Sequence, residues 1–251
     1  MTERLRHFLP AGRTDHTPGF VLHSYPFRET SLIVESFTRE YGRVALVARG
    51  ARRPRSQLRG LLQAFTPLLL SYAGKNELRT LHRAEWQGGV TLPQGLGLLC
   101  GFYINELMLK LLARDDPHSG LFDAYTDALK KLGAGGLTQT DYAIILRRFE
   151  QRLLAELGYA QPFTHEADSG PAITADNSYR YFCERGALPL GKSDASGLIL
   201  RGKTLLDLAQ DNYDDPVSLT QSKQLMRLII NHHLGGQILH ARELLKDLQQ
   251  L

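Results

Sequence analysis

The residues with the clearest chemistry are seven arginines between positions 39 and 59, in a stretch that contains a single acid, Glu40. They are Arg39, Arg43, Arg49, Arg52, Arg53, Arg55 and Arg59. The guanidinium group is planar and offers a fork of N–H donors that matches the oxygens of a phosphate. Because almost no acid is present to neutralise this charge, the stretch predicts a site for a polyanion. A solvated charged loop is the alternative.

A second basic group lies in a predicted helix over 140–157. Its members are Arg147, Arg148 and Arg152. One interpretation is a solvated helix face whose arginines pair with Glu150 or Glu156. The other is a basic rim beside an apolar groove, which would suit an acidic peptide with a hydrophobic end. The sequence leaves both interpretations open.

Catalytic and metal-binding motifs are absent from the sequence. It contains no GxSxG, GxxxxGK[ST], HExxH or GxGxxG pattern. In 159–200 only His165 and Cys183, with Asp168 as a poor substitute, could contribute to a zinc site, which usually needs four ligands. We therefore expect no enzymatic activity, no bound metal and no cofactor.

The composition is that of a globular protein whose charge is unevenly distributed. Of the 251 residues, 43% are apolar and 22% are charged, which supports a folded core. Residues 1–90 contain 14 lysines and arginines against 7 acids, whereas residues 91–251 contain 16 against 19. The basic first third is therefore the part expected to meet a polyanion.

The expected compartment is a reducing cytoplasm. The two cysteines, Cys100 and Cys183, form no CxxC or other ligand pair, and a disulfide framework is not supported. No run of about 18 apolar residues is present that could span a membrane. The stretch 1–18 lacks the apolar core of a secretory signal and is expected to form a flexible leader.

The first third of the chain is predicted to form a small barrel. Five short segments with strand-like composition are separated by glycine and turn signals. They are 20–26, 30–38, 42–51, 62–74 and 77–86. Closure into a barrel is favoured because it removes the two exposed edges of an open sheet. In the third segment Val44, Leu46 and Ala48 alternate with other residues and should face the core.

Aromatic residues close to the arginines in sequence could stack on nucleic-acid bases. They are Phe37, Tyr41, Phe65 and Tyr72. A small barrel also needs large apolar side chains in its interior, so at least half of these four are expected in the core.

From Leu98 onward the apolar period becomes helical. Helices are predicted from Leu98 to Leu112, after Gly120 and over 140–157, and two more over 218–235 and 240–251. Between them, 159–200 is irregular, with a brief strand-like segment. The predicted fold class is therefore α+β, with an N-terminal barrel, a helical domain and a small β-containing insertion.

Sequence motifs in this order resemble the RecO family of bacterial DNA repair and recombination proteins. They include "GRVALVARGAR" followed by "QAFTPL", then "YINEL", "LRRFEQRLLAELGY" and "LHARELL". The resemblance covers residues 19 to about 250. It implies an N-terminal OB-fold for DNA binding at 19–90, a helical bundle at 91–158, a zinc-ribbon-like segment at 159–200 and C-terminal helices at 201–251.

The resemblance also implies a function. Such proteins have no active site, bind single- and double-stranded DNA and anneal complementary strands. They bind the acidic tail of single-stranded DNA-binding protein and, with RecR, help to load RecA. The seven barrel arginines would bind DNA, and Arg147, with Arg148 adjacent, would hold the acidic tail. No membrane is involved, and a nucleoid-associated location in the cytoplasm is expected.

The chain departs from the family pattern at the zinc segment. Many relatives have CxxC after the "LGY" motif and a second cysteine pair further on, whereas this chain has "HEAD" at the first place and no second pair. Packing is expected to hold this segment in place of zinc. A protein-interaction adaptor and an RNA-binding OB-fold protein remain the alternative functions.

Overall fold

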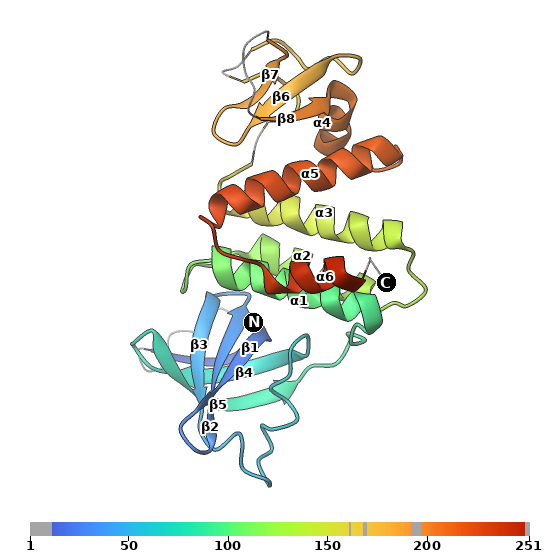
Figure 1. Cartoon of the computed structure of the whole chain (residues 1–251). Helices are drawn as coiled ribbons and strands as arrows, with labels where there is room; N and C mark the ends of the chain where they lie inside the picture. The colour runs from blue at the N-terminus through green and yellow to red at the C-terminus, as the bar shows by residue number, and fades with distance from the viewer. Residues whose placement is uncertain (1–11, 161, 168–169, 192–196, 249–251) are drawn as a thin grey trace, which may run out of the picture. The chain divides into compact units, whose positions relative to one another are not determined.

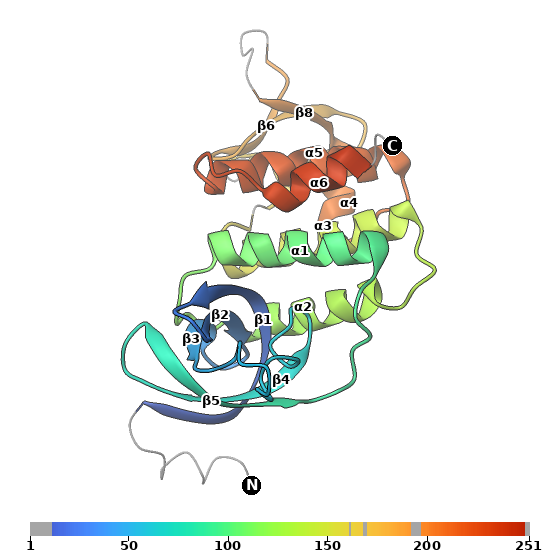
Figure 2. The ribbon, with the colours of Figure 1, turned by 60° about the horizontal axis from the view of Figure 1, so that its bottom comes forward.

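The computed structural model describes residues 12–160, 162–167, 170–191 and 197–248, with side chains as far as Leu245. The chain divides into two compact units, one formed by Met1–Gly135 with Leu239–Leu251 and the other by Gly136–Ile238. Figures 1 and 2 show the elements of each unit. The strands and helices confirm the predicted α+β class, with a five-stranded OB-like barrel followed by helices and a small strand-containing region.

The first unit begins with a closed barrel whose strands are ordered β1-β2-β3-β5-β4. They are β1 (Arg13–Phe27), β2 (Ser31–Thr38), β3 (Gly42–Ala48), β4 (Pro67–Ala73) and β5 (Leu78–Trp86). Neighbouring strands are antiparallel except for β3 and β5, which pair in parallel through Ala45–Leu78 and Val47–Thr80. This single parallel pair closes the barrel.

The first strand is longer than its sequence pattern predicts. β1 starts at Arg13, so residues 13–18 belong to the barrel and not to the leader expected over 1–18. The strand bends and pairs with β4 through its first part and with β2 through its second part (Figure 2). The alternation of exposed and buried residues is irregular around Thr14 to Thr17, where the register shifts. A bulge of this kind hides the period that identifies a strand in sequence.

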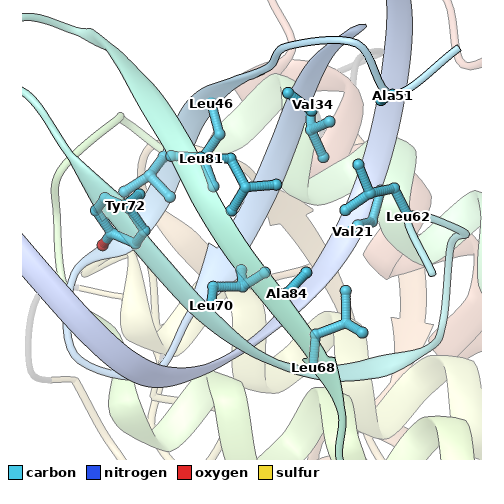
Figure 3. Close-up of a cluster of buried hydrophobic side chains, with 12 residues drawn as sticks. Val21, Val34, Leu46, Ala51, Leu62, Leu68, Leu70, Tyr72, Leu81 and Ala84 are labelled. Atoms are coloured by element: carbon cyan, nitrogen blue, oxygen red, sulfur yellow. The ribbon is translucent and has the colours of Figure 1, made fainter. Parts of the chain in front are cut away.

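The barrel interior is a cluster of aliphatic residues and one aromatic, Tyr72, from all five strands (Figure 3). Val44, Leu46 and Ala48 are each at most 1% exposed, which confirms their predicted inward orientation. Ala51 and Leu62 join the cluster from the segment between β3 and β4, and Leu58 and Leu61 pack against it. Burial of these side chains is the main favourable term for the barrel.

In the described part of the first unit, three helices accompany the barrel: α1 (Gly95–Leu111), α2 (Ser119–Leu132) and α6 (His240–Leu248). Asn105 of α1 donates to the backbone oxygen of Leu22 in β1 at 2.9 Å and accepts from the Tyr125 hydroxyl of α2 at 2.7 Å. Burial of Asn105 and Tyr125 makes both bonds hard to replace with water. The Asn105 amide therefore fixes both helices to the barrel.

The next residue of the "YINEL" motif holds α6. The Glu106 carboxylate accepts from the backbone N–H groups of His240 at 3.0 Å and Ala241 at 2.9 Å. These are unsatisfied donors of the first turn of α6, where a negative charge is also favoured by the helix dipole. The Lys110 ammonium lies 3.6 Å from the same carboxylate and forms an i,i+4 ion pair with it on the surface of α1. One short motif thus positions three helices.

The described residues of the second unit form three helices and a three-stranded sheet. They are α3 (Gln139–Glu156), β6 (Ser178–Phe182), β7 (Gly186–Pro189), β8 (Leu198–Arg201), α4 (Gly202–Ala209) and α5 (Pro216–His233). The small sheet has the order β7-β6-β8 and lies next to α4 (Figure 1). Helix α4 spans 8 residues, which is too short for a helical repeat of apolar residues to be recognised in the sequence. Among the described residues no helix is both long and apolar enough to cross a bilayer.

Replacing Tyr125 by Phe tests the Asn105 linkage. The variant keeps the ring but leaves the buried Asn105 oxygen without its donor, so the free energy of unfolding should fall by about 1–3 kcal/mol. Urea denaturation followed by circular dichroism measures the change. Tyr41→Phe, at a residue 36% exposed, is the control and should change stability by no more than about 0.5 kcal/mol. Equal stability of Tyr125→Phe and the parent chain would contradict a structural role for this bond.

Candidate nucleic-acid interface

The strand pairing places both ends of the β3–β4 connection (residues 49–66) at one end of the barrel. The connection leaves β3 at its carboxyl end and enters β4 at its amino end. Because β3 is parallel to β5 and β4 is antiparallel to β5, both points face the end of the barrel toward which β5 runs. β4 begins beside the carboxyl end of β5, where Leu68 pairs with Trp86, and β3 ends just after its pairing with Thr80 near the start of β5. The β1–β2 turn is at the same end, since Leu32 at the start of β2 pairs with Ala48 at the end of β3.

The connection is a series of tight turns held to the core by apolar side chains. Backbone bonds join Arg53 to Gly50 at 3.1 Å, Ser56 to Arg53 at 3.0 Å and Arg59 to Ser56 at 3.2 Å. Gly50 has φ +67°, a conformation that glycine adopts without strain. Since the buried Ala51 and Leu62 anchor the segment, its polar residues are directed to solvent.

Five of the seven predicted arginines are exposed on or next to this connection. They are Arg49, Arg52, Arg53, Arg55 and Arg59, and we call this group the arginine end of the barrel. One Arg52 nitrogen donates to the backbone oxygen of Glu29 at 3.4 Å. Within the described part of the chain none of the five forms an ion pair with a carboxylate. Their charge is therefore available to an external anion.

The other two arginines are used inside the unit. Arg39 forms a bidentate ion pair with Asp123 of α2, with its second nitrogen 2.9 Å from the carboxylate, and lies over the Phe122 ring. The hydrogen bond from Arg39 to Asp123 raises the pKa of the Arg39 guanidinium. Arg43 donates to the backbone oxygen of Leu109 at 2.7 Å. These contacts fix the α1–α2 region to the barrel.

Arg43 also neutralises a buried acid. The Glu35 side chain is 5% exposed and lies 3.9 Å from an Arg43 nitrogen, with Arg114 on its other oxygen. Burial lowers the pKa of Arg43, and the Glu35 charge acts in the opposite direction. A buried carboxylate is costly without a partner, so the Arg43 charge adds to the direct hydrogen bond that Arg114 gives to Glu35.

The candidate stacking aromatics are mostly structural. Phe37 and Phe65 are 0% and 2% exposed, and each packs against an aromatic ring of a helix in the same unit. Tyr72 is 1% exposed, and burial raises its pKa to about 12. Tyr41, at 36% exposed, is the one of the four that reaches solvent, in the β2–β3 turn at the opposite end of the barrel.

Sequence reasoning missed Arg28 as a member of the arginine end. It lies in the β1–β2 turn, is exposed and packs over the Phe27 ring at 5.2 Å. Arg28 is separated in sequence from Arg49, the first arginine of the group, by twenty-one positions. The hairpin register brings it close, because the backbone N–H of Arg52 bonds the oxygen of Thr30 at 2.8 Å. Only a correct strand register could have found it.

The arginines of α3 have different surroundings. Arg147 is 6% exposed and bonds Glu150 at 2.6 Å, and the half-exposed Arg152 bonds Glu156 at 2.6 Å. These are the ion pairs that the solvated-face interpretation predicted, although the Arg147 pair is buried. Arg148 is exposed and pairs with Asp211 at 2.8 Å.

An apolar pocket lies beside Arg148 in the second unit. It has a volume of about 310 Å³ and is lined by residues of α3, α4 and α5, including Leu154, Leu208 and Met226. Gln151 lines the pocket and donates to the Tyr213 hydroxyl at 2.6 Å, and the Arg148 guanidinium lies over the Tyr213 ring. Burial raises the pKa of the Tyr213 hydroxyl. Most side chains that line the pocket are therefore apolar, and the Arg148 cation is linked to it through Tyr213 and Gln151.

The 159–200 segment does not fit a structural zinc. It contains one histidine and one cysteine, His165 and Cys183, and Asp168 lies outside the described residues. No group of three potential ligands converges in the described part of the chain. The sheet core is instead built from buried tyrosine and aliphatic side chains, among them Tyr179, Tyr181 and Leu200.

Comparison with known proteins assigns the family. Residues 13–89 match the model described as Recombination protein O N terminal, and residues 93–243 match Recombination protein O C terminal. The DNA repair protein RecO of Nitrosospira multiformis is 55% identical over 242 residues, covering 95% of this chain and 98% of the relative. That of Aromatoleum aromaticum is 52% identical over 239 residues, covering 95% and 98%. The chain belongs to the RecO family.

This RecO family member is thus a DNA repair protein by its relatives' names. The boundary between the two family models falls in 90–92, between β5 and α1. The arginine end lies in the N-terminal RecO model, and Arg148 with its pocket lies in the C-terminal one. The two candidate sites therefore belong to different parts of the family architecture.

Replacing Arg43 by Ala distinguishes structural from exposed arginines. Because Glu35 loses one of its two cationic partners, the free energy of unfolding should fall by about 2–3 kcal/mol. Arg49→Ala, at an exposed residue six positions further along the chain, should stay within about 0.5 kcal/mol of the parent. Urea denaturation of both variants measures this. Similar stability of the two variants would show that the contacts of Arg43 with Glu35 and Leu109 do not stabilise the fold.

Proposed function

We propose that this protein is a non-enzymatic recombination mediator that binds single- and double-stranded DNA through the arginine end of the barrel. The observation that carries the proposal is the set of five exposed arginines without a described carboxylate partner. A guanidinium engaged by a carboxylate must lose that partner before it can bind phosphate, whereas these five need not. They are presented on one short, anchored connection, so they can contact consecutive phosphates of one strand.

The finer parts of the proposal rest on the family motifs. They are annealing of complementary strands, binding of single-stranded DNA-binding protein, and RecA loading together with RecR. Annealing is compatible with phosphate recognition, because contacts to the backbone leave base edges free to pair. A nucleoid-associated location in the cytoplasm follows from the same proposal.

We also propose that the apolar pocket near Arg148 holds the acidic tail of single-stranded DNA-binding protein. A volume of about 310 Å³ can take one large apolar side chain, and Arg148 can meet a carboxylate. Arg147 stands one residue away, but its ion pair with Glu150 is buried. In this proposal Arg148 makes the contact and Arg147 supports the helix that presents it.

The DNA site is tested by changing Arg52, Arg53 and Arg55 together to alanine. Affinity for single-stranded DNA should fall by a similar factor for all sequences, and the slope of log K against log salt should flatten by up to about 3. Fluorescence anisotropy with a labelled oligonucleotide at several salt concentrations measures both quantities.

The matched control removes three exposed cations elsewhere in the same unit, with Lys75, Lys130 and Lys131 changed to alanine. This triple variant loses the same charge, so a purely global effect of net charge would weaken it equally. Unchanged binding in the arginine variant would refute the arginine end as the site. No DNA binding by the parent chain near physiological salt would favour the adaptor alternative. Tighter binding of RNA than of DNA would favour the RNA alternative.

The peptide site is tested by two opposite changes at one ion pair. Arg148→Ala should weaken binding of an acidic peptide that ends in phenylalanine by about tenfold, since a charge-assisted bond contributes about 1.5–3 kcal/mol. Asp211→Asn should strengthen it, because Asp211 competes for the same guanidinium. Isothermal titration calorimetry with the peptide measures both variants.

DNA affinity of the two variants is the control and should match the parent. Loss of peptide and DNA binding together in Arg148→Ala would contradict separate sites. Weaker peptide binding in Asp211→Asn would contradict competition between Asp211 and the peptide. It would indicate that the ion pair between Arg148 and Asp211 stabilises the site.

A further inference from the structure

Trp86 is a large aromatic side chain left in solvent at the end of β5. It is 67% exposed, more than any other large hydrophobic residue described in the structure. Transfer of such a surface into water is unfavourable, and tryptophan usually packs at least one face against protein. The ring has the backbone of Gly88 near one edge. Its exposure leaves the ring available to a partner outside the chain.

The strand register places Trp86 at the arginine end. Trp86 pairs with Leu68, the second residue of β4, and Gln87 bonds the oxygen of Pro67 at 3.0 Å. The β3–β4 connection ends at residue 66, immediately before Pro67. The ring therefore stands beside the exit of the segment that carries the exposed arginines.

The register also sets the side from which the ring projects. Paired residues of antiparallel strands direct their side chains to the same face of the sheet. Leu68 is 0% exposed and belongs to the barrel core, beside Ala84 in Figure 3. Trp86 thus leaves the sheet on the inner face at the end of β5, where no strand in the described part of the chain covers it. A flat ring at the mouth of a barrel, next to cations, forms a stacking platform.

We propose that Trp86 stacks on a base of single-stranded nucleic acid bound at the arginine end. The inference rests on the proposed function and adds a base-contacting residue to it. Arginines bind the backbone of single and double strands alike, because phosphates are present in both. A stacking ring requires an unstacked base, which a duplex does not offer. Trp86 is therefore the group that makes the site prefer single strands.

The chain suits a direct spectroscopic test because Trp86 is its single tryptophan. Intrinsic fluorescence reports this one side chain without any label. Titration with an oligothymidine longer than the roughly 16 nucleotides that one OB fold can cover should quench the emission. An abasic oligonucleotide of equal length carries the same phosphates but no bases, and should bind without comparable quenching.

Trp86→Ala should weaken binding of the oligothymidine by about tenfold, within the range measured for base–aromatic stacking. Binding of the abasic strand and of duplex DNA should stay within about twofold, and the salt slope should not change, because phosphate contacts are kept. Trp86→Phe should retain most of the affinity. Tyr41→Ala is the matched control, an exposed aromatic at the opposite end of the barrel, and should bind as the parent does.

Each outcome separates this inference from the proposed function. If Trp86→Ala binds oligothymidine like the parent while the triple arginine variant is weakened, stacking is wrong and the arginine site stands. Equal weakening on oligothymidine, abasic strand and duplex also overturns stacking, since it indicates a general loss of the site. If the parent binds none of the three, the proposed function itself fails.

Discussion

The parallel pairing of β3 with β5 is the constraint on which the candidate DNA site depends. It closes the barrel and makes the carboxyl ends of both strands point the same way. The exit of the β3–β4 connection and the end of β5 then meet at one end, although twenty positions separate residue 66 from Trp86. An open antiparallel sheet would leave these segments free to diverge. Closure thus collects cations and an aromatic ring into a single surface, and the apolar anchors Ala51 and Leu62 keep that surface in place.

The arginines of the barrel divide by their neighbours and not by their position in sequence. Arg43 and Arg49 lie six residues apart, yet one holds the buried Glu35 and the other faces solvent. Glu35 comes from the adjacent strand, so its proximity follows from the β2–β3 register. Net charge alone overstates the charge that a ligand can use, because several cations of the first unit are already committed to internal acids. The number of unpaired cations at one end is the better measure of the site.

The sequence predicted the elements better than it predicted their partners. Five strands, the long helices and the inward alternation of β3 follow from local periodicity, and the structure confirms them. The start of β1 was placed too late because a bulge interrupts its alternation. The short α4 carries too few residues to show a helical period. Helix α6 packs in the first unit through the contact between the Glu106 carboxylate and the backbone N–H of His240. These two residues are 134 positions apart, so the sequence pattern does not reveal the contact.

The same limit explains which candidate site residues could be foreseen. Composition identified the arginine connection, because an excess of cations over acids is a property of the sequence itself. It could not tell which arginines meet an acid in space, and it offered four aromatics for stacking of which three are buried. Aromatic residues are needed inside a small barrel, so proximity in sequence to a basic stretch carries little weight. Exposure at the end of a strand is a stronger signal, because it is unfavourable unless a ligand covers the ring. That is why Trp86, and none of the core aromatics, fits the role of a base-stacking residue.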